Sequence, residues 1–233
     1  MRTALVLSAG GMFAAWQAGV WKALHRHFEP SLIVGASAGA LNGWLIASGV
    51  SPDELARAWL NPDVAKILRN TRRAEALHAS ARELHTKYQP RVPFGLTVTQ
   101  VPGMRQRLVR NGSVTWQHLA ATCSIPFFFP RVEIQGAGYV DGGLLGALPL
   151  WAAEEMGATR AIALRCLTTL PFRILRAMIP ARQPTSALET VLIEPSAPLG
   201  SLYDACVWSA ANIERWIELG ERDGHRAASS ITM

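Results

Sequence analysis

The chain has 233 residues, of which 49% are hydrophobic and 17% charged, and it carries a net charge of +6. This length fits one domain, residues 1–233, with a sizeable buried core. Three scattered cysteines with no C-x-x-C pair argue against a disulfide scaffold and against a thiolate metal site. Such cysteine usage suits a reducing compartment, so we expect a cytoplasmic protein.

The positive charge is concentrated between residues 66 and 110, where ten Lys and Arg accompany two Glu. This segment therefore carries +8, and the rest of the chain carries −2. A basic region of this kind faces nucleic acid, anionic lipid or only water. We favour a solvated face and expect no nucleic-acid partner.

The first half of the chain alternates between predicted strands and helices. Strands are predicted at residues 3–8 and 32–35, and helices at residues 13–27 and 38–48. The sequence Ser51-Pro-Asp-Glu54 is typical of a helix start, because it has a Ser cap, an early Pro and an acid three residues after the cap. From there, helical sequence continues to about residue 86.

Two uncharged stretches, Thr3–Trp21 and Pro30–Pro52, have the length of a membrane span. Gly and Ser interrupt both at the points where a strand would turn into a helix. We therefore expect buried strand–turn–helix units, with neither an export signal nor a spanning helix.

The second half of the chain adds more strands and ends in a helix. Strands are predicted at residues 94–101, 105–110, 132–135, 139–140, 160–167 and 188–193. Helices are predicted at residues 115–123 and 149–156 and from 202 to about 226. Residues 168–188 are basic and broken by Pro, so they form an excursion between strands. This order predicts an α/β domain with a mainly parallel sheet.

A first chemical motif, Gly35-Ala-Ser37-Ala-Gly39, lies between a predicted strand and a predicted helix. A serine at this position sits on a sharp turn that only small neighbours permit, and its hydroxyl is exposed at the end of the sheet. The N-terminus of the following helix favours developing negative charge. The motif predicts a nucleophile at Ser37; the alternative is a structural turn rich in Gly and Ser.

A second motif, Ser8-Ala-Gly10-Gly11-Met12, follows the first predicted strand. Glycines at a helix start expose backbone N–H groups that can bind an anion. Their spacing matches neither the Rossmann nor the P-loop pattern. With a nucleophile at Ser37, an oxyanion hole is favoured over a phosphate loop. A tight turn that requires glycine is the remaining alternative.

A third motif, Tyr139-Val-Asp141-Gly-Gly143, places an acid between a short strand and a Gly-Gly turn. Asp-Gly is also a frequent turn without chemistry. Together with a nucleophile, however, Asp141 supplies the base that Ser37 requires.

Together, these motifs resemble the patatin-like phospholipase family over nearly the whole chain. The matching segments are Gly10-Gly11, Gly35–Gly39, Cys123–Pro130, Tyr139–Gly143, Pro149 and Ile217–Gly220. The resemblance implies a modified α/β-hydrolase with a mainly parallel central sheet flanked by helices. It also implies a catalytic dyad of Ser37 and Asp141, an oxyanion hole at Gly10, Gly11 and Met12, and no cofactor or metal.

The chain departs from the family pattern in the glycine loop. Ala9, Phe13 and Ala14 stand where the family usually has a glycine, a basic residue and a glycine. Backbone donors survive such changes because they need no side chain. The substitutions do, however, remove any role that the basic side chain has in the family. They therefore leave open which substrate headgroup is bound and how fast the reaction is.

Chain order independently favours a dyad over a triad. An α/β-hydrolase triad runs Ser, acid, His, and His225 is the only histidine that follows Asp141. It lies near a polar C-terminus, where chains are often mobile. A carboxylate is a weak base at its ordinary pKa of about 3.9, and apolar neighbours such as Phe127, Phe128 and Phe129 would raise that pKa.

The expected activity is hydrolysis of fatty acyl esters, of phospholipids or other lipids, through an acyl-enzyme on Ser37. An acyltransferase with the same nucleophile and a catalytically weakened lipid-binding module are the alternatives. The segment Pro171–Pro180, followed by Arg182, combines apolar and basic residues without an acid and predicts contact with an anionic membrane. The alternative is a surface loop whose apolar residues pack on the core.

Overall fold

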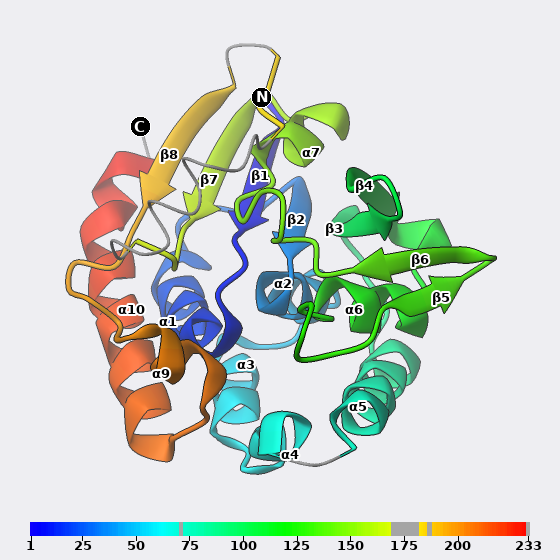
Figure 1. The fold of residues 1–233 in the computed structure, drawn as a ribbon. Coiled ribbons are helices and arrows are strands. Elements are labelled where there is room, and N and C mark those ends of the chain that lie inside the picture. The colour runs from blue at the N-terminus through cyan, green and yellow to red at the C-terminus, as the bar shows by residue number, and fades with distance from the viewer. Residues whose placement is uncertain (70–71, 169–181, 186–187, 232–233) are drawn as a thin grey trace.

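This computed structural model describes residues 1–69, 72–168, 182–185 and 188–231. In this part of the chain, the protein is built on a sheet of eight strands (Figure 1). The strands are β1 (Thr3–Leu7), β2 (Leu32–Ala36), β3 (Phe94–Val101), β4 (Arg105–Arg110), β5 (Val132–Ile134), β6 (Ala137–Val140), β7 (Arg160–Leu164) and β8 (Glu189–Ile193). Their order is β5-β6-β3-β2-β1-β7-β8, and β4 pairs with β3 off this path. The five strands from β3 to β8 in that order are parallel, and β4, β5 and β6 pair antiparallel. The predicted α/β class and mainly parallel sheet are confirmed.

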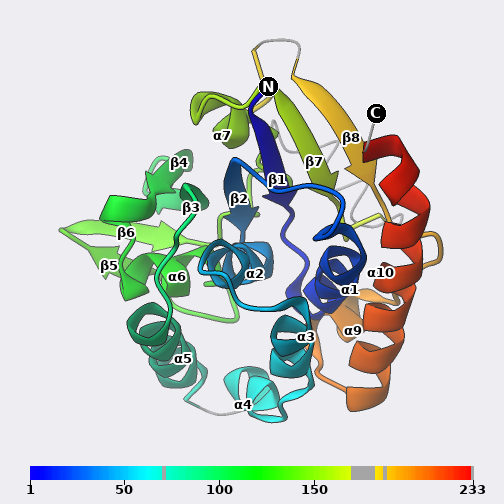
Figure 2. The ribbon, with the colours of Figure 1, turned by 180° about the vertical axis from the view of Figure 1, so that it is seen from behind.

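Helices cover both faces of this sheet. They are α1 (Ala14–Leu24), α2 (Ala38–Ala47), α3 (Pro52–Leu60), α4 (Asp63–Arg69), α5 (Arg73–Lys87), α6 (Trp116–Thr122), α7 (Leu150–Glu155), α9 (Leu202–Cys206) and α10 (Ala210–Ile231), with 3₁₀ turns η1 (Gly11–Phe13) and η2 (Asn111–Ser113). On one side α1 and α10 run next to each other, which Figures 1 and 2 show from opposite directions. Their contact includes the ring of Phe13 against the edge of Trp216, with centroids 5.0 Å apart.

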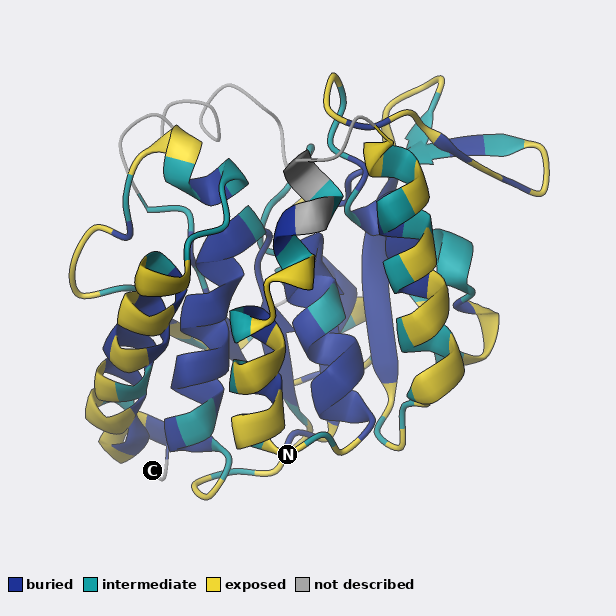
Figure 3. Ribbon diagram, turned by 90° about the horizontal axis from the view of Figure 1, so that it is seen from below, coloured by how far each residue is buried: buried dark blue, intermediate teal, exposed yellow. Residues whose placement is uncertain are grey.

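The inner strands are buried on both faces because each face has its own helical cover. In β1, Leu5 and Leu7 face the core that α1, α2 and α10 share, whereas Ala4 and Val6 face Trp151 of α7. Such strands are expected to be continuous apolar runs and not to alternate with polar residues, as β1 shows. Figure 3 shows these strands as buried, whereas the outer faces of the helices are exposed.

Two predicted helices are divided in the structure. The helical run predicted from Ser51 to about residue 86 ends first at Leu60, because Pro62 forces Asn61 into an extended conformation with ψ 120°. Three helices, α3, α4 and α5, therefore replace one. The Ser51–Glu54 capping box is present as predicted.

The prediction of one continuous terminal helix over residues 202–226 was also wrong, because the structure has two helices there. It breaks at Val207, whose extended φ of −120° and ψ of 119° separate α9 from α10. The indole of Trp208 then donates to the carbonyl of Trp59 on α3, which ties the break to the helical layer. The strand predicted at 160–167 ends earlier, at Leu164.

None of the described helices is both long enough and apolar enough to cross a bilayer. The segment Pro171–Pro180, on which the expected membrane contact was placed, lies outside the described residues.

Candidate active site

Ser37 occupies a strained turn between β2 and α2. Its φ of 53° and ψ of −135° lie in a region that residues with a side chain rarely adopt. The turn closes because its flanking glycines lack a Cβ: one on Gly35 would lie 2.6 Å from the Cα of Ala40, and one on Gly39 would lie 2.3 Å from the carbonyl oxygen of Ser8. This is the strand–turn–helix geometry that the G-x-S-x-G spacing predicts.

Asp141 reaches Ser37 because β2 and β6 share one edge of β3. Strand β4 occupies the other edge, so β2 pairs with the first half of β3 and β6 with its end. Since β2 runs parallel and β6 antiparallel to β3, the two strands end facing each other. Ser37 and Asp141 are the residues that follow those ends. The Ser37 hydroxyl donates to Oδ2 of Asp141 over 2.6 Å.

Backbone contacts hold the carboxylate in place. The Asp141 N–H donates to the carbonyl of Ser124 over 3.0 Å, and the Thr99 hydroxyl donates to the Asp141 carbonyl over 2.9 Å. A Cβ on Gly142 would lie 1.9 Å from the carbonyl oxygen of Thr97, so only glycine fits after the aspartate. Asp141 therefore comes from a rigid corner of the sheet.

Burial changes the acidity of Asp141. The side chain is 5% exposed, and this burial raises the pKa of its carboxyl to about 6. Hydrogen bonds from the Ser37 hydroxyl and from the Gly143 N–H, at 2.7 Å, act in the opposite direction. A carboxyl with this pKa is ionised at neutral pH and is a stronger base than an exposed aspartate.

The glycine loop lies beside Ser37. Gly11 has a φ of 54°, and Gly11 and Met12 line the same cavity as Ser37, whereas Gly10 is pressed against Cys166 behind the loop. Within the described residues, none of the N–H groups of Gly10, Gly11 and Met12 donates to a protein acceptor. Gly11 and Met12 are therefore better placed than Gly10 to bind an anion next to Ser37.

The substitutions in this loop have a packing explanation. Phe13 and Ala14, at the family's basic and glycine positions, are almost completely buried in the core of α1 and α10. Their side chains fill the helical interface and do not line the cavity of Ser37. The departures therefore concern core packing, and they leave the backbone donors in place.

The sequence motifs did not point to one further donor, the N–H of Ala38. Ala38 is the first residue of α2, it lines the cavity with Ser37, and its N–H has no protein acceptor in the described part of the chain. The amide of Ser37 itself is occupied, since it donates to the Thr122 hydroxyl over 2.9 Å. The signal was available, because the residue after the nucleophile commonly contributes to an oxyanion hole.

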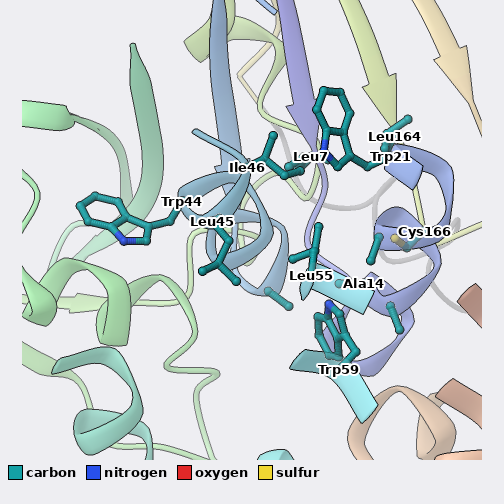
Figure 4. Close-up of a cluster of buried hydrophobic side chains, with 14 of the residues drawn as sticks. Leu7, Ala14, Trp21, Trp44, Leu45, Ile46, Leu55, Trp59, Leu164 and Cys166 are labelled. Carbon is teal, nitrogen blue, oxygen red and sulfur yellow. The ribbon is translucent and has the colours of Figure 1, made fainter. Parts of the chain in front are cut away.

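A buried chain of hydrogen bonds fixes the start of the glycine loop. The Gln17 amide donates to the Ser8 carbonyl over 2.8 Å, and the Asn42 amide donates both to Gln17 and to the Ala14 carbonyl. The Trp59 indole donates to Asn42 over 2.9 Å. Figure 4 shows Trp59 on α3 beside Ala14. One network therefore joins the loop, α1, α2 and the wall of the cavity.

The cavity extends from Ser37 between α2, α3, α4 and α5 and has a volume of about 730 Å³. Many apolar side chains line it, among them Leu41, Leu45, Val50, Leu55, Ala58, Trp59, Val64, Ile67, Ala76, Leu77, Leu84, Ile125, Phe128 and Phe129. Charged residues of α3, α4 and α5 also line it: Glu54, Arg57, Asp63, Glu83 and Lys87. Phe128 and Phe129 thus lie near the site as expected, whereas Phe127 points away and is fully exposed. A cavity of this size and character accommodates an alkyl chain.

No histidine in the described chain lines this cavity. His225 is exposed on α10, and His118 caps α6 through Thr115. Cys123 does line the cavity, but burial and the nearby Asp141 carboxylate raise the pKa of its thiol, so it is not an activated nucleophile. No group of three or more His, Cys, Asp or Glu among the described residues is arranged to hold a metal ion.

Comparison with known proteins places this geometry in a family. The family model described as "Patatin-like phospholipase" matches residues 5–91 and 104–154. Two relatives, patatin-like phospholipase domain-containing protein 6 of mouse and of human, are each 27% identical to this chain in an alignment of 179 positions that covers 69% of this chain. The chain spans only 13% of the length of those relatives.

Two solved structures have a similar fold. VipD from Legionella pneumophila matches with a TM-score of 0.65 and 11% identity over 98% of this chain and 67% of its own. The type III effector ExoU matches with a TM-score of 0.55 and 13% identity over 100% of this chain and 53% of its own. Because the family model covers more than half of the residues and the fold agrees, the chain belongs to the patatin-like phospholipase family.

Proposed function

We propose that the protein is a serine esterase that hydrolyses fatty acyl esters, with phospholipids among its substrates. The main support is the 2.6 Å hydrogen bond from Ser37 to a buried Asp141, beside a mainly apolar cavity that Ser37 lines. The hydrogen bond provides a nucleophile with its base, and the cavity provides a place for the acyl chain. Membership of the phospholipase family supports the same assignment.

The reaction has two steps. In the first, Asp141 accepts the proton of the Ser37 hydroxyl while Oγ bonds to the ester carbonyl carbon. The N–H groups of Gly11, Met12 and Ala38 stabilise the resulting oxyanion, and the alcohol leaves with the proton from Asp141. In the second step, Asp141 takes a proton from water and the resulting hydroxide attacks the acyl carbon. Asp141 then returns the proton to Oγ of Ser37 as the fatty acid leaves.

The strained backbone at Ser37 contributes to this chemistry. At the positive φ of 53°, the Ser37 hydroxyl donates to Asp141. A nucleophile held in this position needs little reorganisation before attack. Strain of this kind persists only where the surroundings enforce it, which Gly35 and Gly39 do here.

The rate is expected to depend on pH through Asp141. Because the base must be ionised and burial raises its pKa to about 6, kcat/KM should rise with pH below about 6 and level off above about 7. The measurement is a pH profile with a soluble p-nitrophenyl ester between pH 4.5 and 8.5. A profile with its midpoint near 4 would mean that Asp141 is not the base that titrates.

The same buried charge is expected to destabilise the fold at neutral pH. With a folded pKa above its unfolded value of about 3.9, Asp141 favours folding when protonated, and this contribution is lost as pH rises through 6. Asp141→Asn should therefore increase the free energy of unfolding by about 3 kcal/mol at pH 8. Denaturant titrations at pH 8 and pH 4 test this, because the gain should vanish at pH 4. An equal gain at both values would assign it to packing.

A fluorophosphonate probe tests the proposed nucleophile, because only an activated serine reacts with it. The wild type is expected to be labelled on Ser37, as identified by peptide mass, and Asp141→Asn is expected to be labelled far more slowly. Labelling without release of fatty acid into water, but with transfer to an alcohol, would indicate an acyltransferase. No labelling at all would favour a non-catalytic lipid-binding module.

A further inference from the structure

Large apolar side chains are exposed on two segments that border the cavity of Ser37. Phe127 and Phe128 lie on the segment between α6 and β5, and Leu202 and Tyr203 lie on α9. Phe127 is fully exposed and Tyr203 is 71% exposed. Both segments lie toward the end of the sheet to which β1, β2, β7 and β8 point (Figure 1). We call these four side chains the apolar rim.

The turn that carries Phe127 leaves its ring exposed to solvent. The carbonyl of Ile125 accepts the N–H groups of Phe128 and Phe129, and Phe129 is buried beneath the turn. Phe127 has a φ of 71°, a conformation that bulky residues rarely adopt and that Gly or Asn would adopt more easily. An aromatic ring at this position costs both backbone strain and exposed apolar surface, and none of the described residues covers the ring.

The apolar surface continues from the rim into the cavity. Phe128 belongs to both, because the residue is 46% exposed and also lines the cavity. On the other side, Ala205 and Cys206 of α9 line the cavity while Leu202 at the start of the same helix faces outward. A molecule that crosses the rim toward Ser37 therefore remains in contact with apolar side chains.

Helix α9 is held firmly against the site. A capping box between Ser201 and Asp204 fixes its start. Its Ala205 carbonyl lies so close to the glycine loop that a Cβ on Gly11 would be 2.3 Å from it. The rim residues on α9 thus lie on a helix that contacts the proposed oxyanion hole and also lines the cavity through Ala205 and Cys206.

We propose that the apolar rim inserts into the surface of a lipid aggregate and docks the cavity mouth on it. This inference rests on the proposed function, since a fatty acyl chain must leave its aggregate to reach Ser37, and a rim continuous with the cavity lets it do so without crossing water. Phe and Leu partition into the acyl boundary of a bilayer, and Tyr places its ring there with its hydroxyl in the headgroup layer. Binding is therefore apolar and does not require anionic lipid.

Vesicle sedimentation tests the docking. All proteins in this assay carry Ser37→Ala, so that no lipid is hydrolysed. The vesicles contain phosphatidylcholine alone or phosphatidylcholine with phosphatidylserine, and binding is measured at low and at high salt. Partitioning onto pure phosphatidylcholine should persist at high salt. It should fall about ten- to a hundredfold in the double variant Phe127→Ser, Tyr203→Ser, because two large rings no longer insert. Met104→Ser, which changes another exposed apolar residue in the turn between β3 and β4, is the matched control and should bind as before.

Kinetics with an intact Ser37 separate docking from catalysis. The double variant should hydrolyse p-nitrophenyl butyrate in solution at the wild-type kcat/KM, because neither residue lines the cavity, and should lose about tenfold or more on esters held in vesicles. Loss on both substrates would overturn the docking role. So would a wild type that never partitions, unchanged partitioning of the double variant, or concentration-dependent self-association through these residues. Because sedimentation requires no turnover, an inactive wild type that still docks would refute the proposed function alone.

Discussion

Replacement of Ser37 by alanine is expected to lower kcat for a p-nitrophenyl acyl ester by about 10⁴-fold or more, and Asp141→Asn should be nearly as damaging. In the proposed mechanism the two residues act as one unit, with the Ser37 proton transferred along their 2.6 Å hydrogen bond. In Asp141→Asn the amide cannot accept that proton, although its shape is retained. Initial rates at pH 8, with circular dichroism to confirm folding, are the measurement.

His225→Ala is the matched control for this experiment. His225 follows Asp141 in the chain, as the histidine of a triad would, but it is exposed on α10 and does not line the cavity. The variant should therefore retain wild-type activity. Turnover by purified Ser37→Ala at the wild-type rate would refute the assigned nucleophile, and a collapse of activity in His225→Ala would require a triad.

Gly11→Ala is expected to lower kcat by about 10²- to 10³-fold, the range seen when an oxyanion donor is removed. Gly11 has a φ of 54°, and an added Cβ would lie 2.3 Å from the Ala205 carbonyl oxygen. The loop must shift, so the N–H groups of Gly11 and Met12 move relative to Ser37. The measurement is kcat and KM with the soluble ester.

Gly136→Ala provides a matched control for backbone strain. Gly136 also has a positive φ, 79°, but an added Cβ there has no neighbour within 4 Å, and the residue lies at the β5–β6 turn away from the cavity. The Gly136→Ala variant should introduce a similar backbone strain and have little effect on kcat. Met12→Ala keeps the backbone amide and should be mild. If all three variants lost activity equally, the loop would have only a structural role.

Much of the local structure follows from residue types. The inner strands were recognisable because a strand covered on both faces is apolar throughout, as β1 and β2 are. Ser51 and Glu54 predicted the start of α3 because a cap depends on residues only three apart. The breaks at Asn61 and Val207 were missed because helical periodicity continues on both sides of them, and only the proline at position 62 gave a local signal.

The sequence alone also determined the candidate chemistry. Gly35–Gly39 and Asp141–Gly143 are short motifs whose chemistry depends on adjacent residues, so Ser37, Asp141 and the glycine loop were identifiable without a structure. The identity of Phe13 and Ala14 was visible as well, but their burial against α10 was not, since α10 lies some 200 residues further along the chain.

Only the tertiary structure decided how these parts meet. Ser37 and Asp141 are 104 residues apart, and they form a hydrogen bond because β2 and β6 end facing each other along one edge of β3. The cavity, the contact of α9 with Gly11 and the outward ring of Phe127 likewise depend on which distant segments lie together. Strand pairing and burial involve residues far apart in the chain, so no local pattern specifies them, and the site takes its geometry from them.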